Sequence, residues 1–444
     1  MRVQPRPFPA APSGCGLLAK GVHAQEMQWN LRSPAKRWVA ATATIVVTAA
    51  YCGVATCRLL ADRFAQSSDE ASLRRASRLD PGNAEYQHML GLHQLALQAP
   101  KEAIGPLNRA TVLNPNSAKY WMDLAATDQL LGDSEKERAA LNHALAVDSH
   151  TPAIAWQAAN LFLADGLSDA AMKQFRSVLE TDLPLRNPAI RTAWEIRPDV
   201  DSLLEQVIPP PANMAFLQFL LAENQTAAAA KVWEKMYLLQ QDVDRPDLIG
   251  YERYLLSHGE VEQASRVWQQ GAKMSDIAAY QPSPENLLVN GDFSLDILNG
   301  GFDWVHQRVD GVAVALDTNE TRSSSRSLRI AIDGAGISDA GISQLVLVQP
   351  NTRYQFHAVY KAKDMDGAGA MQLAVHDAYR PTALFTSEDL GNADFWKDAG
   401  GSFVTPADTH LIRVHVIRVP AGRPIRGNLW IDGLLLVQSR GEGK

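Results

Sequence analysis

A spacing of 34 residues constrains the fold of this chain more than any other feature. Asp80, Asn114, Asp148 and Asp182 lie at successive steps of 34. A fixed period of this length indicates repeated helical hairpins, each burying its apolar face against its neighbours. The same step relates further apolar and small residues, namely Leu73, Leu107, Leu141 and Phe175, then Ala76, Ala110, Ala144 and Val178, and finally Pro81 and Pro115.

The unit from Ala84 to Ser117 shows how one period is built. Large residues are expected on one helix face, with small ones where two helices approach closely. The pattern resembles the tetratricopeptide repeat, whose consensus residues occur here at Leu90, Gly91, Ala103, Ala110 and Pro115. The next unit departs from the pattern, because Glu137 stands where the small Ala belongs.

Two further units start at Phe216 and Tyr251 and align without gaps, 35 residues apart. The resemblance therefore covers residues 66–279, with a break near 183–212 where "IPPPAN" predicts extended chain. The helically spaced Trp, Phe and Tyr residues are expected to form inter-helix core. The resemblance implies a solenoid that binds protein partners.

Residues 38–57 form an uncharged, mostly apolar run, "WVAATATIVVTAAYCGVATC". As a helix it would span about 30 Å, which matches the hydrocarbon core of a membrane. Lys36 and Arg37 precede it, so the positive-inside rule predicts a signal anchor over 38–61 and a disordered cytoplasmic segment over 1–37. A cleaved signal peptide and a buried soluble helix are the alternatives, and Met27 is a second candidate start.

Charge and cysteine usage exclude several classes. The net charge of -7 is spread along the chain, so we expect no nucleic-acid partner. The cysteines are Cys15, Cys52 and Cys57, which leaves the rest of the chain without a disulfide or thiolate metal site.

After residue 280 the period changes to short alternating runs separated by Gly, Asn, Asp and Ser. Such runs predict an antiparallel sandwich or jelly roll over 285–440. The opening "NLLVNGDFS", the central "NTRYQFHAVYKA" and the closing "WIDGLLLV" resemble carbohydrate-binding modules of families four and nine. The fold class predicted for the whole chain is a transmembrane helix, an all-α tetratricopeptide solenoid and an all-β jelly roll.

A sugar site needs hydrogen-bonding groups for hydroxyls and an aromatic platform. If the strands that carry them are neighbours, the outward positions form one polar face. Tyr379, Phe395 and Trp396, in loop-like surroundings, are candidates for the platform, whereas the alternative is a solvated face with loop aromatics packed inward. The tentative carbohydrate-binding residues are His357, Gln372, His376, Tyr379, Trp396, Arg413 and His415.

The second resemblance also implies a structural calcium between the first and last strands. Here Ser294 replaces the first carboxylate and only Asp432 remains, so we expect neither this metal nor any other cofactor. No motif typical of hydrolases, nucleotide-binding enzymes or metalloenzymes occurs, and we expect no enzyme.

Two hypotheses follow. One is a bacterial inner-membrane adaptor, with its bulk outside the cytoplasm, whose repeats bind proteins and whose jelly roll binds a polysaccharide in envelope or exopolysaccharide assembly. The other is a structural scaffold in which the sandwich binds only protein. A glycosidase ranks last, since two carboxylates facing one cleft would be required.

Overall fold

The computed structural model describes residues 33–67 and 69–439. The chain divides into two compact units, residues 1–140 and 141–444, and each is described by itself. The predictions of a disordered segment before residue 33 and of an alternative start at Met27 lie outside the described residues, as does Cys15.

The first unit begins with the apolar helix α1, Pro34–Ala65, which extends beyond the predicted anchor at both ends. Its apolar part is long enough to cross a membrane and is exposed along its length. The last turns differ, because Ala61 and Ala65 are buried against Leu73 and Ala76 of α2, Glu70–Leu79. The end of α1 thus supplies the first helix of a hairpin whose second helix is α2.

The remaining helices of this unit begin and end at the residues that the repeat pattern marks. Asn83 caps α3 by accepting a hydrogen bond from the backbone N–H of Glu85, and Gly132 ends α5 in the left-handed conformation. Gly91 lies against Leu107, where a Cβ would come within 2.6 Å of the leucine side chain. The small consensus residue therefore permits the close approach of α3, Ala84–Ala96, and α4, Pro100–Leu113, which are followed by α5, Ala118–Leu131, and α6, Ser134–Val147.

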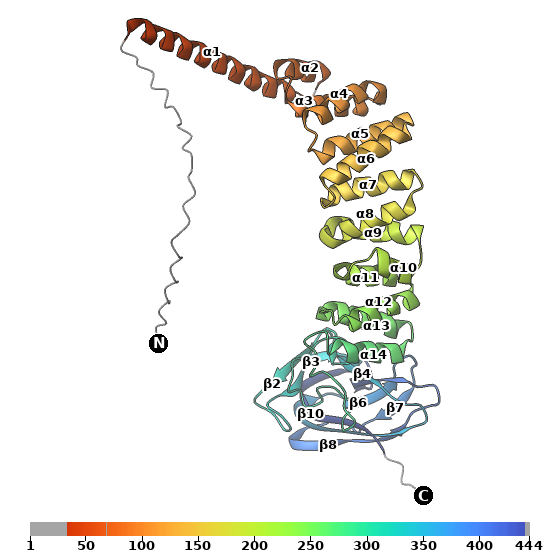
Figure 1. Cartoon of the computed structure of the whole chain (residues 1–444). Coiled ribbons are helices and arrows are strands. Elements are labelled where there is room, and N and C mark those ends of the chain that lie inside the picture. The colour runs from red at the N-terminus through yellow and green to blue at the C-terminus, as the bar shows by residue number, and fades with distance from the viewer. Residues whose placement is uncertain (1–32, 68, 440–444) are drawn as a thin grey trace, which may run out of the picture. The chain divides into compact units, whose positions relative to one another are not determined.

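Helices of the second unit continue as antiparallel pairs up to the β domain (Figure 1). The predicted break at 183–212 is largely helical, because α9 and α10 lie within it and Pro210–Ala212 forms a 3-10 turn. The non-helical positions there are residues 197–199 and 207–209. The helices are α7, Pro152–Ala164; α8, Ser168–Thr181; α9, Leu183–Ile196; α10, Val200–Gln206; α11, Asn213–Ala222; α12, Thr226–Leu238; α13, Arg245–Ser257; and α14, Val261–Gly271.

The last helix pair packs directly on the sandwich. Trp268 of α14 is buried, and its indole N–H donates to the backbone oxygen of Tyr280 at 2.8 Å. Gly301 lies against the Trp268 ring, and Gly300 lies against Ile249 of α13. Glycines at 300 and 301 thus allow a sandwich loop to pack closely on the repeats.

The β domain consists of two five-stranded antiparallel sheets, in the orders β1-β4-β9-β6-β7 and β2-β3-β10-β5-β8. Alternate residues of each strand point into the space between the sheets, as the period of two requires. This sandwich, following an apolar helix and helical repeats, confirms the predicted fold class. The strands are β1, Val305–His306; β2, Val312–Asp317; β3, Ser327–Gly336; β4, Asp339–Leu347; β5, Arg353–Asp366; β6, Ala370–Asp377; β7, Ala383–Thr386; β8, Ala393–Val404; β9, Leu411–Val419; and β10, Pro424–Gln438.

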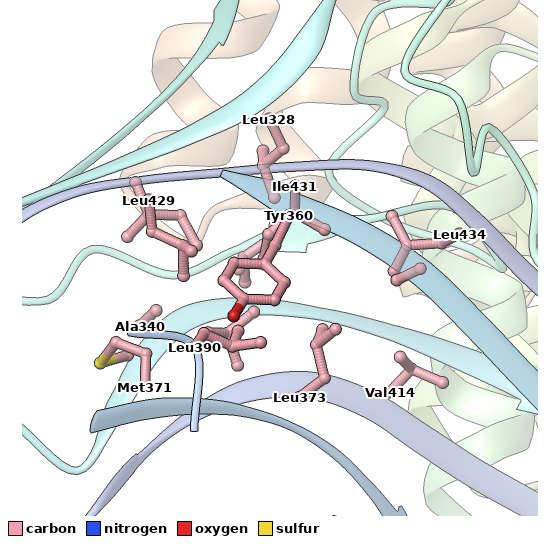
Figure 2. Close-up of a cluster of buried hydrophobic side chains, with 14 of the residues drawn as sticks. Leu328, Ala340, Tyr360, Met371, Leu373, Leu390, Val414, Leu429, Ile431 and Leu434 are labelled. Atoms are coloured by element: carbon pink, nitrogen blue, oxygen red, sulfur yellow. The ribbon is translucent and has the colours of Figure 1, made fainter. Parts of the chain in front are cut away.

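Figure 2 shows part of the core between the sheets. Leu429 and Ile431 of β10 point toward Met371 and Leu373 of β6, which belongs to the opposite sheet. All four are buried, and each contributes about 1.5–3 kcal/mol by leaving water.

Candidate functional site

Four of the predicted binding residues share one outward face of the first sheet. His376 of β6 lies directly opposite Arg413 of β9, and His415 lies opposite Ala374. Directly opposed residues of antiparallel strands point to the same side, so both histidines and Arg413 project outward together. Gln372 points outward from the same face of β6, because it lies two residues before Ala374 in the strand.

The two histidines and Asp339 form a hydrogen-bonded relay. His415 Nδ1 lies 2.6 Å from Asp339 Oδ2, and His415 Nε2 lies 2.7 Å from His376 Nδ1. Because the carboxylate accepts from Nδ1–H, Nε2 of a neutral His415 accepts from His376. Burial, followed by electrostatic interactions with His415 and Arg413, lowers the pKa of His376, so the relay carries little charge on that ring.

The other polar side chains on this face differ in whether they already have a hydrogen-bond partner. Gln372 Nε2 donates to Asp389 Oδ1 at 2.7 Å. Arg413 is exposed, and within the described residues its guanidinium has no hydrogen-bond or ion-pair partner. Arg413 is therefore the group of this face that is free to bind an acceptor.

Tyr379 lies in the turn between β6 and β7 and faces the helical repeats. Its hydroxyl donates to the backbone oxygen of Leu256, in α13, at 2.7 Å. About half of the residue is exposed. Part of its ring is accessible to a ligand, whereas its hydroxyl is already used in the hydrogen bond between the sandwich and the helical repeats.

The two remaining predicted residues belong to the other sheet. His357 is on β5, where its Nε2 lies 3.6 Å from Asp398, and Trp396 is half-buried within β8 rather than in a loop. The seven predicted residues therefore do not form one surface, because β5 and β6 follow each other in sequence but lie in different sheets. Phe395, next to Trp396, is 82% exposed.

A wide groove of about 930 Å³ crosses the outer face of the second sheet, and its lining residues include none of those predicted from the sequence to bind sugar. Its floor is made where Ala313 of β2, Ala331 of β3 and Asn428 of β10 lie side by side. Small side chains at outward positions leave the space that longer ones would fill. The rim carries polar side chains from the strand ends and loops: Asp333, Asp364, Asp366, Asn392 and Arg426.

Several of these polar groups keep hydrogen-bonding capacity. Asn428 Oδ1 accepts from Arg329 Nη2 at 2.7 Å, which leaves its amide N–H groups for a ligand. Asp366 Oδ2 accepts from Arg426 at 2.8 Å, which fixes both side chains at the rim. Asn392 is occupied, because it holds the backbone of Met365 through both amide atoms. The groove thus offers donors and acceptors of the kind that sugar hydroxyls need.

A weak sequence signal for this groove exists in hindsight. "VAVALD" and "LRIAID" place alanine at outward-facing positions where exposed strands usually carry longer polar residues. The signal becomes meaningful only when β2 and β3 are known to pair, which brings Ala313 opposite Ala331.

The residues at the calcium position that the resemblance implies do not fit a cation. Asp432 is fully buried, and its Oδ2 accepts from the backbone N–H groups of Arg322 and Ser323 at 2.8 and 2.9 Å. Ser294 donates its hydroxyl to Asp292 at 2.9 Å. N–H donors surround the carboxylate that a metal would need, so Asp432 serves as a structural acceptor.

No protein-family model matches the chain, and no curated protein matches it. Among solved structures, "CBM4 structure and function" is 15% identical over 34% of this chain and 99% of its own, with a TM-score of 0.28. MamA is 18% identical over 40% of this chain and 95% of its own, with a TM-score of 0.29. "Family 16 Carbohydrate Binding Module-2" is 21% identical over 34% of this chain and 99% of its own, with a TM-score of 0.26.

Proposed function

We propose that this protein is a membrane-anchored, non-catalytic adaptor whose sandwich binds a polysaccharide and whose helical repeats bind protein partners. An envelope or exopolysaccharide assembly system in bacteria is the setting that this combination suits. The groove on the second sheet is the observation that carries the proposal.

The shape of the groove suits a chain of sugar units. It is open along the sheet and bounded by charged and amide side chains, whereas its floor is made of small residues. Beside it lies Trp430, whose ring is flanked by the guanidinium of Arg329 at 5.7 Å and the ammonium of Lys363 at 5.8 Å. These two positively charged groups are placed to donate hydrogen bonds to the hydroxyl groups of a ligand.

The membrane part of the proposal rests on α1. Its apolar segment is uncharged over the length that a bilayer core requires, and residues 41–56 are all exposed in the described unit. A helix of this kind gains about 25 cal/mol per Å² of apolar surface removed from water.

The experiment uses the full chain in lipid nanodiscs and immobilised bacterial and plant polysaccharides, with binding followed by interferometry. Ala313→Trp would fill the groove floor, whereas Ser402→Trp places the same side chain at an exposed position of β8 in the same sheet, outside the groove. We expect at least one polysaccharide to bind, with affinity lost in the first variant and kept in the second. Failure of every polysaccharide to bind, or equal binding by both variants, would overturn the proposal and favour a scaffold that binds only protein.

A further inference from the structure

A pocket of about 610 Å³ lies where the last repeats meet the sandwich. Its walls come from α13, from the segment 299–307 that includes β1, from the β6–β7 turn and from β9. The same junction is held by the Tyr379–Leu256 hydrogen bond and by the packing of Gly301 on Trp268. The pocket is therefore part of a packed interface within one unit.

Glu252 is a buried acidic residue in the lining of this pocket. The residue is 2% exposed, and its Oε1 is buried with no hydrogen bond within the described chain. Burial is the main cause that raises the pKa of Glu252 to about 8, and the charge of Arg253 opposes this rise. Near neutral pH the carboxyl group is therefore mostly protonated and can donate a hydrogen bond into the pocket.

Two guanidinium groups line the same pocket, Arg253 from α13 and Arg413 from β9. Both residues are exposed, and neither has an ion-pair or hydrogen-bond partner in the part of the chain that the structure describes. His306 of β1 adds a ring whose Nε2 is buried and has no partner among the described residues. The pocket therefore combines positive charge with donors, and near neutral pH its described lining residues include no mostly ionised carboxylate.

We propose that this pocket binds the carboxylate of an acidic sugar, such as a uronic acid unit of an acidic polysaccharide. The planar fork of a guanidinium matches a carboxylate, whereas two arginines would repel a cationic ligand. Ser257, Asn299 and Gln307 also line the pocket and can bond to ring hydroxyls. This site is separate from the groove, so it adds charge selectivity to the proposed polysaccharide binding.

The site also predicts a pH dependence. Glu252 shares the pocket with Arg253 of its own helix, Tyr379 of the β6–β7 turn, His306 of β1 and Arg413 of β9. When Glu252 ionises at high pH, its charge repels a bound carboxylate and competes for the arginines. Affinity should therefore fall as the pH rises through the pKa of Glu252, and Glu252→Gln, which resembles the protonated form, should remove that fall.

The test is calorimetric titration of the full chain in nanodiscs with trigalacturonate, with neutral galactotriose and with acetate. At pH 6.5 we expect trigalacturonate to bind at least about ten-fold more tightly than either control, the loss of one bidentate pair being of that size. Arg413→Gln and Arg253→Gln should each weaken binding about ten-fold. Arg266→Gln, on α14 outside the pocket, serves as the matched control and should bind normally.

Two comparisons decide the assignment. Ala313→Trp should leave trigalacturonate affinity unchanged, which separates this pocket from the groove, and Glu252→Gln should bind equally at pH 6.5 and 9. Equal affinity for trigalacturonate and galactotriose, acetate binding as tight as trigalacturonate, or no effect of the pocket arginine variants would overturn the proposal. Circular dichroism of each variant confirms that the fold is retained.

Discussion

The hydroxyl of Tyr379, in the sandwich, donates a hydrogen bond of 2.7 Å to the backbone oxygen of Leu256, in the last helix pair. The bond joins residues 123 positions apart in the chain. Leu256 lies near the end of α13, and its backbone oxygen also accepts from the backbone N–H of Gly259 at 3.1 Å. The tyrosine thus adds a hydrogen bond from the sandwich to a carbonyl group at the end of this helix.

Tyr379→Phe should loosen this contact without changing the ring. We expect the free energy of opening the β6–β7 turn to fall by roughly 1 kcal/mol, which should appear as about five-fold faster hydrogen exchange in this turn. Tyr360→Phe is the matched control, because the Tyr360 hydroxyl has no hydrogen-bond partner among the described residues although its ring is buried (Figure 2). Unchanged exchange in Tyr379→Phe would show that the bond does not hold the junction.

A second prediction concerns Gly301, which lies where the sandwich packs on the last helix pair. Its φ is +66°, and a Cβ would come within 1.9 Å of the Trp268 ring. Gly301→Ala should therefore combine backbone strain with a clash and lower stability by roughly 2–5 kcal/mol, measured by calorimetric unfolding. Gly334 has a φ of +103° and open space around it, so Gly334→Ala should lose only the stability that backbone strain costs. Gly250 lies on α13 in open space, so Gly250→Ala should leave stability unchanged or raise it. Equal effects at positions 301 and 334 would exclude the clash.

The repeats were predictable because one period fixes both packing and helix ends. Gly91 against Leu107 and the helix boundaries near Pro115 follow from spacing along the chain. Even Glu137, which breaks the consensus, is accommodated locally, since its buried carboxylate accepts from Gln129 at 2.8 Å.

The binding surfaces were only partly predictable, because they depend on which strands become neighbours. Alternation correctly placed His376, Arg413 and His415 outward, since β6 and β9 do pair. The same rule could not show that His357 belongs to the other sheet. No period in the sequence predicts the pocket beside Glu252, because its walls come both from the helical repeats and from loops and strands of the sandwich.

Asp303 carries a prediction about pH and stability. The residue is fully buried, and its Oδ2 accepts from Leu298 N–H at 2.7 Å while Oδ1 has no partner within the described chain. Burial raises the pKa of Asp303 from 3.8 to about 7, against the opposing effect of backbone hydrogen bonds. The folded state therefore binds more protons than the unfolded state between these values, so the free energy of unfolding falls as the pH rises from about 4 to 7.

Asp303→Asn should remove this contribution, because the amide oxygen keeps the Leu298 bond and carries no charge. We expect the variant to be more stable than the parent at pH 8, by roughly 1–4 kcal/mol, and to match it more closely at pH 4. Glu252 contributes a slope of the same sign up to about pH 8, so some pH dependence should remain. Unfolding midpoints at both pH values test this, with Asp310→Asn, an exposed carboxylate, as the control. A stability difference that is independent of pH would contradict the assignment.

The location of the chain is tested through α1. Val46 is exposed in the middle of the apolar helix, and Val46→Arg should oppose insertion by about 2.5–3.5 kcal/mol, whereas Val46→Leu should not. In cells, the parent and Val46→Leu should resist alkaline carbonate extraction, and a larger share of Val46→Arg should be extracted. The intact mass of the extracted parent distinguishes an anchor from a signal peptide, since cleavage would remove α1 residues. A full-length chain in the membrane pellet supports the anchor, and because Ala61 and Ala65 at the end of α1 pack on α2, the first hairpin would then begin at the membrane surface.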